Sequence, residues 1–435
     1  MLKKICLAVI VLAAAHSVAK VVEAGTCISG PTQFATIQDA VNAATPGSHV
    51  LVCPGTYPEQ VTINKPLTLR GVRLSSASGA TIVAPAGGVQ PNTTSLSSGN
   101  PLIAQLLVDS TQDVRISNLT VDGSNNGLSG CDTPIFLGIF FRNASGVVSH
   151  TAVANQALGA SDASCQTGLA IFAQSGQGGA AKVEIVNSTV HGYQKNGITG
   201  NEVGTWVRLA NNTVVGQGPT TGAAENGVQI GFGASGRVTG NTVMDDVWSP
   251  DVITDPGDAA SGILVFAAGG VTIRDNVVGN TQFGIALITN ADPLTGGPVP
   301  ADNNVVVDNE ISASHIFDGI EVCSDDNTIR GNTINRSDEA GIHLDSSCTN
   351  SDSSPTGKGN RVKFNAINSA CAGILVGTGT SLGANSVFGN DFFNVTNTIL
   401  NADQCLASAS AMASPRTTRV TAATQAKRSA RPLRP

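Results

Sequence analysis

Asn309-Glu310-Ile311 is followed by Asn332-Thr333-Ile334 and then by Asn365-Ala366-Ile367, so one phrase of Asn, any residue and an aliphatic residue keeps returning. Related copies begin at Asn212, Asn241, Asn276 and Asn390. Successive asparagines lie 23 to 35 residues apart. Self-similarity at such a period indicates a repeat architecture, and it outweighs any local pattern.

A second phrase, Gly followed by Ile, Val or Leu, alternates with the first. It begins at Gly197, Gly227, Gly262, Gly284, Gly319, Gly341 and Gly373. Runs such as Gly262-Ile263-Leu264-Val265-Phe266 alternate with period two, which predicts short strands. About twelve stacked coils of such strands would bury one column of Ile, Val and Leu. We assign the asparagines a structural role, because Asn tolerates left-handed corners and its amide can bond to the next Asn.

These repeats resemble the right-handed parallel β-helix repeat family, the pectate lyase-like type with carbohydrate-binding and sugar-hydrolysing members, over roughly residues 27–404. The resemblance implies a secreted bacterial member and an all-β fold, a single-stranded right-handed parallel β-helix. Residues 34–71 resemble the opening of pectinesterases and of β-helix copper-centre maturation factors. Ile37, Ala40 and Val41 share one helical face, which predicts an N-terminal α-helical cap over the open end of the solenoid.

The two ends of the chain differ from the repeats. Residues 1–24 are typical of a signal peptide, with Lys3 and Lys4 before an apolar stretch and a small-residue cleavage site at Val22-Glu23-Ala24. We expect the cap and first strands over 25–75, the β-helix over 76–404, and a disordered basic tail over 405–435. The chain is therefore predicted to be exported, periplasmic or extracellular, with no integral membrane segment.

Eight cysteines remain once the signal is removed, and an even number in an exported protein predicts disulfides. Spacing favours Cys27–Cys53, Cys131–Cys165, Cys323–Cys348 and Cys371–Cys405. Cys348–Cys371 is a rival, because its separation also equals one coil. The formal net charge is −7 although the tail is basic, so the body is acidic and nucleic-acid binding is not expected.

The sequence lacks the intact active-site motifs of the β-helix enzymes. Gly192-Tyr193-Gln194 is similar to a pectinesterase motif, but Lys195 stands where that family has Asp. The polygalacturonase Gly-His-Gly and the alginate epimerase Asp-Pro-His-Glu are absent. No known catalytic set therefore transfers to this chain.

One acid–base group is predicted from the repeats themselves. In each Gly phrase the residue after Gly points inward and the next one points outward. Glu321 and His343 should therefore lie side by side on consecutive coils, with Asp345 two residues further on. A diagonal of about 8 Å between Glu321 and Asp345 would suit an inverting pair of carboxylates. We predict Glu321, His343 and Asp345 as catalytic residues, with a surface ion pair as the structural alternative.

Two weaker site hypotheses come from charge and composition. Trp248, Arg330 and Lys363 are candidate substrate-binding residues, since an indole can stack on a sugar and stacked cations need an anion between them. Five carboxylates in one long loop are candidate Ca²⁺ ligands. They are Asp245, Asp246, Asp251, Asp255 and Asp258. A solvated acidic loop is the alternative, so no cofactor is required and Ca²⁺ is an optional one.

Two functions of different classes follow. The first is a secreted β-helix protein that binds an extracellular polysaccharide along the rod. This hypothesis includes cleavage of the polysaccharide, in which case the protein would be a hydrolase or lyase. The second is a non-catalytic cell-envelope or surface protein with a structural or adhesive role. The sequence does not decide whether the chain is an enzyme, nor its oligomeric state.

Overall fold

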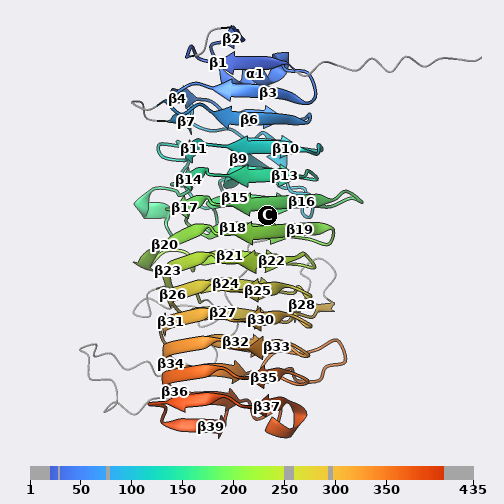
Figure 1. Ribbon diagram of the computed structural model, residues 1–435, viewed down its shortest axis with the longest axis vertical. Helices are drawn as coiled ribbons and strands as arrows, with labels where there is room; N and C mark the ends of the chain where they lie inside the picture. Colours follow the sequence, from blue (N-terminus) through green and yellow to red (C-terminus); the bar gives the residue numbers. More distant parts are fainter. Residues whose placement is uncertain (1–19, 28–29, 75–78, 249–258, 292–296, 406–435) are drawn as a thin grey trace, which may run out of the picture.

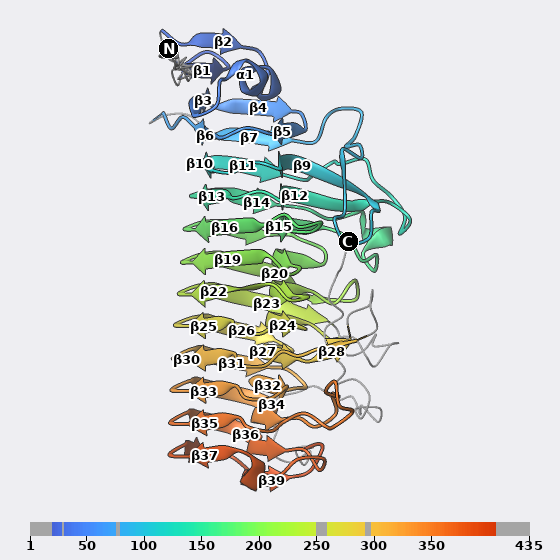
Figure 2. The same ribbon diagram turned by 90° about the vertical axis from the view of Figure 1, so that its right-hand side faces the viewer.

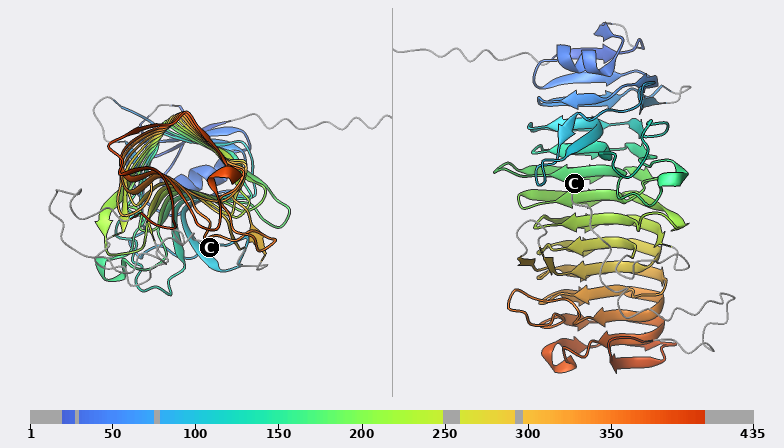
Figure 3. Two further views of the ribbon diagram at one scale, coloured as in Figure 1. Left: turned by 90° about the horizontal axis from the view of Figure 1, so that it is seen from below. Right: turned by 180° about the vertical axis from the view of Figure 1, so that it is seen from behind.

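The computed structural model is a right-handed parallel β-helix, as predicted, and it describes residues 20–27, 30–74, 79–248, 259–291 and 297–405. Coils stack along one axis from β1 to β39 (Figures 1 and 2), and the view along that axis shows them superposed (Figure 3). Each coil contributes strands to three faces, which we call faces 1, 2 and 3 in chain order.

Face 1 is a sheet of fourteen strands. In spatial order these are β2 (Thr32–Phe34), β1 (Val21–Ala24), β3 (Ser48–Val52), β6 (Leu67–Gly71), β10 (Val114–Ser117), β13 (Gly146–Ser149), β16 (Ala181–Val186), β19 (Thr205–Ala210), β22 (Ser235–Thr239), β25 (Thr272–Arg274), β30 (Val305–Val307), β33 (Thr328–Arg330), β35 (Arg361–Lys363) and β37 (Ser386–Phe388). Neighbouring strands pair in parallel, for example Ile329 with Val362.

Face 2 follows the sharp corner after face 1. Its strands are β4 (Gly55–Pro58), β7 (Ala80–Val83), β11 (Leu119–Asp122), β14 (Ala152–Ala154), β17 (Thr189–His191), β20 (Thr213–Thr220), β23 (Thr242–Trp248), β26 (Val277–Thr281), β31 (Glu310–Ser314), the first parts of β34 (Thr333–Leu344) and β36 (Ala366–Val376), and β38 (Asp391–Phe393).

Face 3 completes each coil. Its strands are β5 (Val61–Ile63), β9 (Pro101–Asp109), β12 (Ile135–Arg142), β15 (Leu169–Gln174), β18 (Asn196–Asn201), β21 (Asn226–Gly231), β24 (Ser261–Phe266), β27 (Phe283–Ile288), β32 (Ile320–Cys323), the second parts of β34 and β36, and β39 (Asn397–Asn401). Two short antiparallel additions are β8 (Thr93–Thr94) on β9 and β28 (Asn290–Ala291) with β29 (Pro298–Val299).

The interior of the rod is one continuous column of aliphatic side chains, because the residue after each repeat glycine points inward. Ile263, Ile285, Ile320, Ile342 and Ile374 occupy this position on successive coils and all are buried. The repeat glycines leave room for neighbouring coils: a Cβ on Gly319 would lie 2.5 Å from Ile334 Cγ2. This column explains why the Gly phrase recurs.

The asparagine ladder is present, with one correction. Asn309 Nδ2 and the Asn309 amide both donate to Asn332 Oδ1 at 3.0 Å, and the same pattern repeats along the stack. The left-handed residue at the corner is the one before each asparagine: Asn211, Gly240, Asp275, Asp308, Gly331, Phe364 and Gly389 all have positive φ. The asparagine therefore bonds the coils together, while its predecessor makes the turn.

Helix α1 (Ile37–Ala43) lies in the first coils, where Ile37, Ala40 and Val41 are buried as predicted. Thr36 caps it by accepting from the Asp39 amide, and Glu59 accepts from the Ile37 amide at 2.8 Å. Strand β2 is the outermost strand of face 1 at this end (Figure 1), so the role of α1 as the cap stays a prediction.

The signal peptide over 1–24 stays a prediction, and its last four residues form strand β1. Val21–Ala24 pairs with β2 on one side and with β3 on the other, and Val22, Glu23 and Ala24 are buried. Cleavage after Ala24 would remove a strand from between two others. Residues 1–19 and, of the tail predicted over 405–435, residues 406–435 lie outside the described residues. No helix in the described part is long and apolar enough to cross a membrane.

All four favoured disulfides are confirmed: Cys27–Cys53, Cys131–Cys165, Cys323–Cys348 and Cys371–Cys405. The rival pair Cys348–Cys371 is therefore excluded.

Candidate functional site

Glu321 and His343 lie side by side on face 3, as the Gly phrase predicts. The residues pair in register between β32 and β34. Ile320 and Ile342, which precede them, point into the core. Because side chains alternate along a strand, Glu321 and His343 point away from the core. The distance from His343 Nδ1 to Glu321 Oε2 is 3.2 Å.

Asp318 is a third member that the sequence reasoning missed. It precedes β32, and its Oδ2 lies 3.5 Å from His343 Nδ1. Its other oxygen accepts a hydrogen bond from the Ala340 amide at 3.0 Å, which holds the carboxylate toward the imidazole. Asp318 precedes β32, which begins at Ile320, and strand alternation from Glu321 would place it on the inward side, so the Gly phrase did not reveal it.

Asp345 lies closer to Glu321 than predicted. An oxygen atom of Glu321 and an oxygen atom of Asp345 lie within 4.8 Å of each other, whereas a separation of about 8 Å was predicted from strand geometry. Ser347 holds Asp345 by donating from its amide at 2.9 Å and from its hydroxyl at 2.6 Å. Glu321 and Asp345 therefore do not have the separation that was predicted for an inverting pair of carboxyl groups.

The cluster is closed. Asp318, Glu321 and His343 have no exposed surface, and Asp345 is 2% exposed. Phe283 and Phe317 stack at 4.7 Å on the side toward the N-terminus. The Cys371–Cys405 disulfide and Leu375 pack on the side toward the C-terminus. A polymer cannot reach these side chains in this structure, so the predicted partly open cleft is wrong.

Burial dominates the electrostatics of the cluster. It raises the pKa of Glu321 well above the ordinary value, because the charged form has lost its water. The Asp345 and Asp318 charges raise the pKa further, and His343 lowers it. Three carboxyl groups and one imidazole are therefore enclosed together at a high cost in desolvation.

The predicted substrate-binding residues do not join this cluster. Arg330 and Lys363 pair in register on face 1, whereas the cluster lies on face 3. Lys363 Nζ lies 5.9 Å from the centre of the Phe388 ring. Trp248 is buried against Ala224 and Ala260, so its indole is not presented for stacking on a sugar. Binding of an anionic substrate between Arg330 and Lys363 on face 1 stays a prediction, separate from the acid–base cluster.

Only two of the five predicted calcium ligands, Asp245 and Asp246, lie in the described residues. Asp245 accepts from Asn280 Nδ2 at 2.6 Å, whereas Asp246 is fully buried and accepts from the Tyr193 hydroxyl at 2.6 Å. These two carboxylates therefore serve different partners. Asp251, Asp255 and Asp258 lie outside the described residues.

Asp246 belongs to a second buried group that the sequence did not reveal, with Tyr193 and Glu225. Burial raises the pKa of both carboxyl groups well above the ordinary range, and the Asp246 charge raises that of Glu225 further. Lys195, the departure from the pectinesterase motif, lowers the Glu225 pKa and donates to the Ala224 carbonyl at 2.5 Å. This group lies on earlier coils, and its members are enclosed in the same way.

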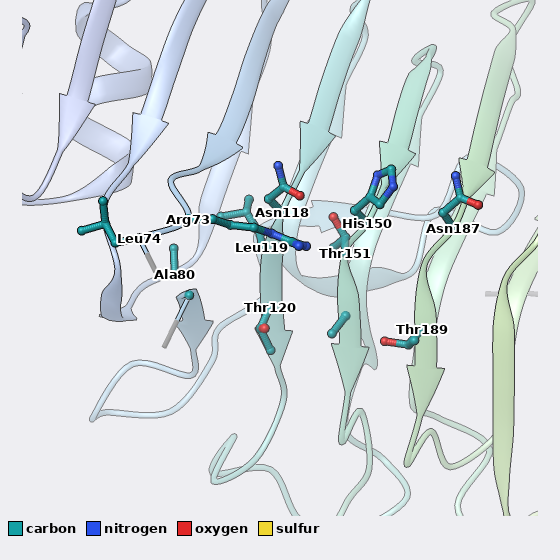
Figure 4. A pocket seen from close by; sticks show the side chains of 12 residues that line it. Arg73, Leu74, Ala80, Asn118, Leu119, Thr120, His150, Thr151, Asn187 and Thr189 are labelled. Atoms are coloured by element: carbon teal, nitrogen blue, oxygen red, sulfur yellow. The ribbon is translucent and has the colours of Figure 1, made fainter. Parts of the chain in front are cut away.

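An open polar groove lies at the corner between faces 1 and 2 on the early coils. Asn118, His150 and Asn187 stand in a row on consecutive coils there (Figure 4), and each has a left-handed backbone. The groove encloses about 470 Å³. It is lined by Arg73, Leu74, Gly79, Ala80, Asn118, Leu119, Thr120, His150, Thr151, Ala152, Asn187 and Thr189. None of these described lining residues carries a carboxyl group.

Comparison with known proteins gives one family match and several shared folds. The model of the family described as Periplasmic copper-binding protein (NosD) matches residues 185–412. No curated protein matches the chain. The structure is similar to the GH136 lacto-N-biosidase from Eubacterium ramulus, with a TM-score of 0.58 and 12% identity over 86% of this chain and 68% of that one. It is also similar to the Dettilon tailspike protein, with a TM-score of 0.50 and 15% identity over the same shares. Such low identities show the fold alone.

The donors in the described residues do not fit copper. Copper(I) prefers thiolate and thioether ligands. The eight described cysteines are all in disulfides, and Met244 is the sole methionine in the described part of the chain. The one close group of donors that includes a histidine offers a single imidazole and two carboxylates, whereas copper(II) favours sites richer in nitrogen. No chemistry of the site is therefore assigned to copper.

Proposed function

The chain belongs to the NosD family of periplasmic copper-binding proteins, and since its donors do not fit copper we propose another role: this exported β-helix binds an extended anionic polysaccharide in the polar groove of faces 1 and 2. The row of Asn118, His150 and Asn187 carries the proposal. These side chains repeat once per coil, at about 4.8 Å. A ladder of polar groups at that spacing suits a polymer better than a small molecule.

The composition of the groove supports a glycan ligand. Amide and hydroxyl groups of Asn118, Thr120 and Thr189 can donate to and accept from sugar hydroxyls. Arg73 supplies a cation with several donors in a planar fork, which suits a carboxylate on the sugar. The lacto-N-biosidase that shares the fold acts on a carbohydrate by name, which is compatible with this class of ligand.

Binding is proposed here without cleavage. Hydrolysis of a glycosidic bond ordinarily uses two carboxyl groups, and none lines the described groove. Catalysis by Glu321, His343 and Asp345 remains a separate proposal that requires the closed cluster to open to a substrate. The binding proposal does not depend on it.

The test begins with a glycan array and continues with titration calorimetry on the best anionic glycan. Arg73→Glu should weaken binding at least tenfold, because it reverses the charge in the groove. Arg330→Glu is the matched control, since it reverses an exposed charge on face 1 outside the groove.

Each outcome separates the hypotheses. Loss of binding with Arg330→Glu but not with Arg73→Glu would place the glycan on the predicted Arg330 and Lys363 stripe and overturn the groove proposal. An array without any binding, together with self-association of the protein, would favour the structural or adhesive role.

A further inference from the structure

The aliphatic column of the rod ends on the last coil with side chains that stay in contact with solvent. Ile399 of β39 is 41% exposed, whereas Ile374, its partner in register on the coil before, has no exposed surface. Val387 and Phe392 are the inward residues of β37 and β38, and they are also only partly buried. These strands lie at the end of the rod opposite α1 (Figure 1). No described residue covers the column there as a further coil would.

The two ends of the rod differ in this respect. At the N-terminal end, Ile37, Ala40 and Val41 of α1 are buried with the column. On the last coil the outward side chains of Phe388 and Phe393 are at least half exposed. Stacked repeats normally end on a polar outer face, which keeps them soluble. An apolar end instead marks an interaction surface.

The last coil also presents open sheet edges. β37 pairs with β35, and β38 and β39 pair with β36; within the described part of the chain no further strand pairs with these three. Their sequences contain neither Lys nor Pro, the residues that commonly protect a free edge. Asp391 is the single charged residue between 386 and 401. The edges are therefore open to pairing with another chain.

The composition of this end favours a second copy over the chain's own segment 406–435. That segment contains six basic residues and no acidic one, so the nearly uncharged last coil offers it little charge complementarity. Its large apolar residues are few: Leu406, Met412, Val420 and Leu433. An identical end matches the surface better. A twofold axis makes the contact isologous and brings the edge strands of the two copies together in antiparallel directions.

We propose that two copies of this chain associate end to end through their last coils, with the edges of β37, β38 and β39 against the same coil of the partner. The end of one coil offers roughly 500 Å² per partner by strand dimensions, below the standard of about 800 Å². A contact of this size predicts a weak, reversible dimer. The groove of faces 1 and 2 lies on early coils and stays open, so the dimer forms whether or not a glycan binds there.

The oligomeric state of the mature protein tests the proposal. Sedimentation equilibrium over a range of concentrations should show a monomer in exchange with a dimer. Small-angle X-ray scattering should give the dimer a maximum length about twice that of the monomer, because the open ends close on each other. Ile399→Lys should weaken dimerisation at least tenfold, since it places a charge in the junction. Val277→Lys is the matched control: Val277 is 40% exposed on β26, in the middle of the rod, and its replacement should change nothing.

Hydrogen–deuterium exchange on the unaltered protein gives a test that needs no variant. Amides of β39 should exchange more slowly at concentrations where the dimer forms than in the monomer. Equally slow exchange in the monomer would mean that segment 406–435 covers the end, and it would overturn the proposal. So would a protein that stays monomeric at its highest soluble concentration, a dimer with the rods side by side, longer end-to-end polymers, or an unchanged affinity in folded Ile399→Lys.

Discussion

Single asparagine side chains hold neighbouring coils together through both of their polar atoms. Asn309 accepts from the amide and the side chain of Asn276, and it donates to Asn332 and to the Ile273 carbonyl. A second ladder at Asn304, Asn327, Asn360 and Asn385 does the same before the face 1 strands. These side chains satisfy backbone groups that the buried corners would otherwise leave without partners.

Replacement of Asn309 by alanine should lower the free energy of unfolding by about 2–4 kcal/mol, because it leaves buried donors and acceptors without partners. Asn390 ends the same ladder and is only half-buried, so Asn390→Ala should cost clearly less. Urea unfolding followed by circular dichroism measures both. Equal costs would contradict the view that enclosure in the stack gives the ladder its strength.

The buried Asp246 should make stability depend on pH. Burial raises the pKa of Asp246 in the folded protein, so the folded state keeps a proton that the unfolded chain has lost. The resulting stabilisation is complete below the unfolded pKa of about 4 and is lost as the pH rises through the folded value. Tyr193, Glu225 and Asp245 face the same carboxyl group, and none of them supplies a positive charge.

Asp246→Asn should therefore raise the free energy of unfolding at pH 8 relative to the parent, by at least about 1 kcal/mol, and less at pH 5. The Asn amide oxygen can still accept from the Tyr193 hydroxyl. Thermal melts across this pH range test the point, with Asp245→Asn as the partly exposed control. The opposite result would be a variant that loses stability relative to the parent, and loses more of it at pH 8 than at pH 5. That result would show that Asp246 is charged in the folded protein.

Strands and corners were accessible to sequence reasoning because their pattern is repeated. The Gly phrase predicted the inward isoleucines and the pairing of Glu321 with His343, and coil spacing predicted the disulfides. Burial of that pair was not predictable in this way. It depends on Phe283 from the preceding coil and on Phe317 from the connection before β32, which the strand period does not relate to Glu321. Asp318 was not predictable either, because it precedes β32 and alternation from Glu321 would place it inward.

Strand β1 predicts where the mature chain begins. Because Val21–Ala24 is paired on both sides, removal of a signal must occur before residue 21. Ser17-Val18-Ala19 offers the small residues that a signal peptidase needs. N-terminal sequencing of the exported protein should therefore give Lys20 as the first residue. A start at Gly25 would mean that β2 and β3 lie side by side or that the first coil rearranges.

At the scale of the whole rod, the structure separates the two candidate sites. The groove with His150 lies on the early coils at the corner of faces 1 and 2, whereas the cluster with His343 lies on late coils of face 3 (Figures 1 and 4). Composition and repeats predicted the rod but not the groove, and a polysaccharide ligand stays a proposal. Asn118, His150 and Asn187 belong to early, irregular coils, where the repeat phrases are degenerate.

The central claim is that the groove holds an extended glycan, and hydrogen–deuterium exchange with and without the best anionic glycan from the array tests it most directly. Slower exchange is predicted for amides in 118–120, 150–152 and 187–189, which form the groove on three consecutive coils. Amides of β33 and β35, which carry Arg330 and Lys363, should be unchanged. Protection of β33 and β35 alone, or of none of these segments at a saturating glycan concentration, would contradict the account.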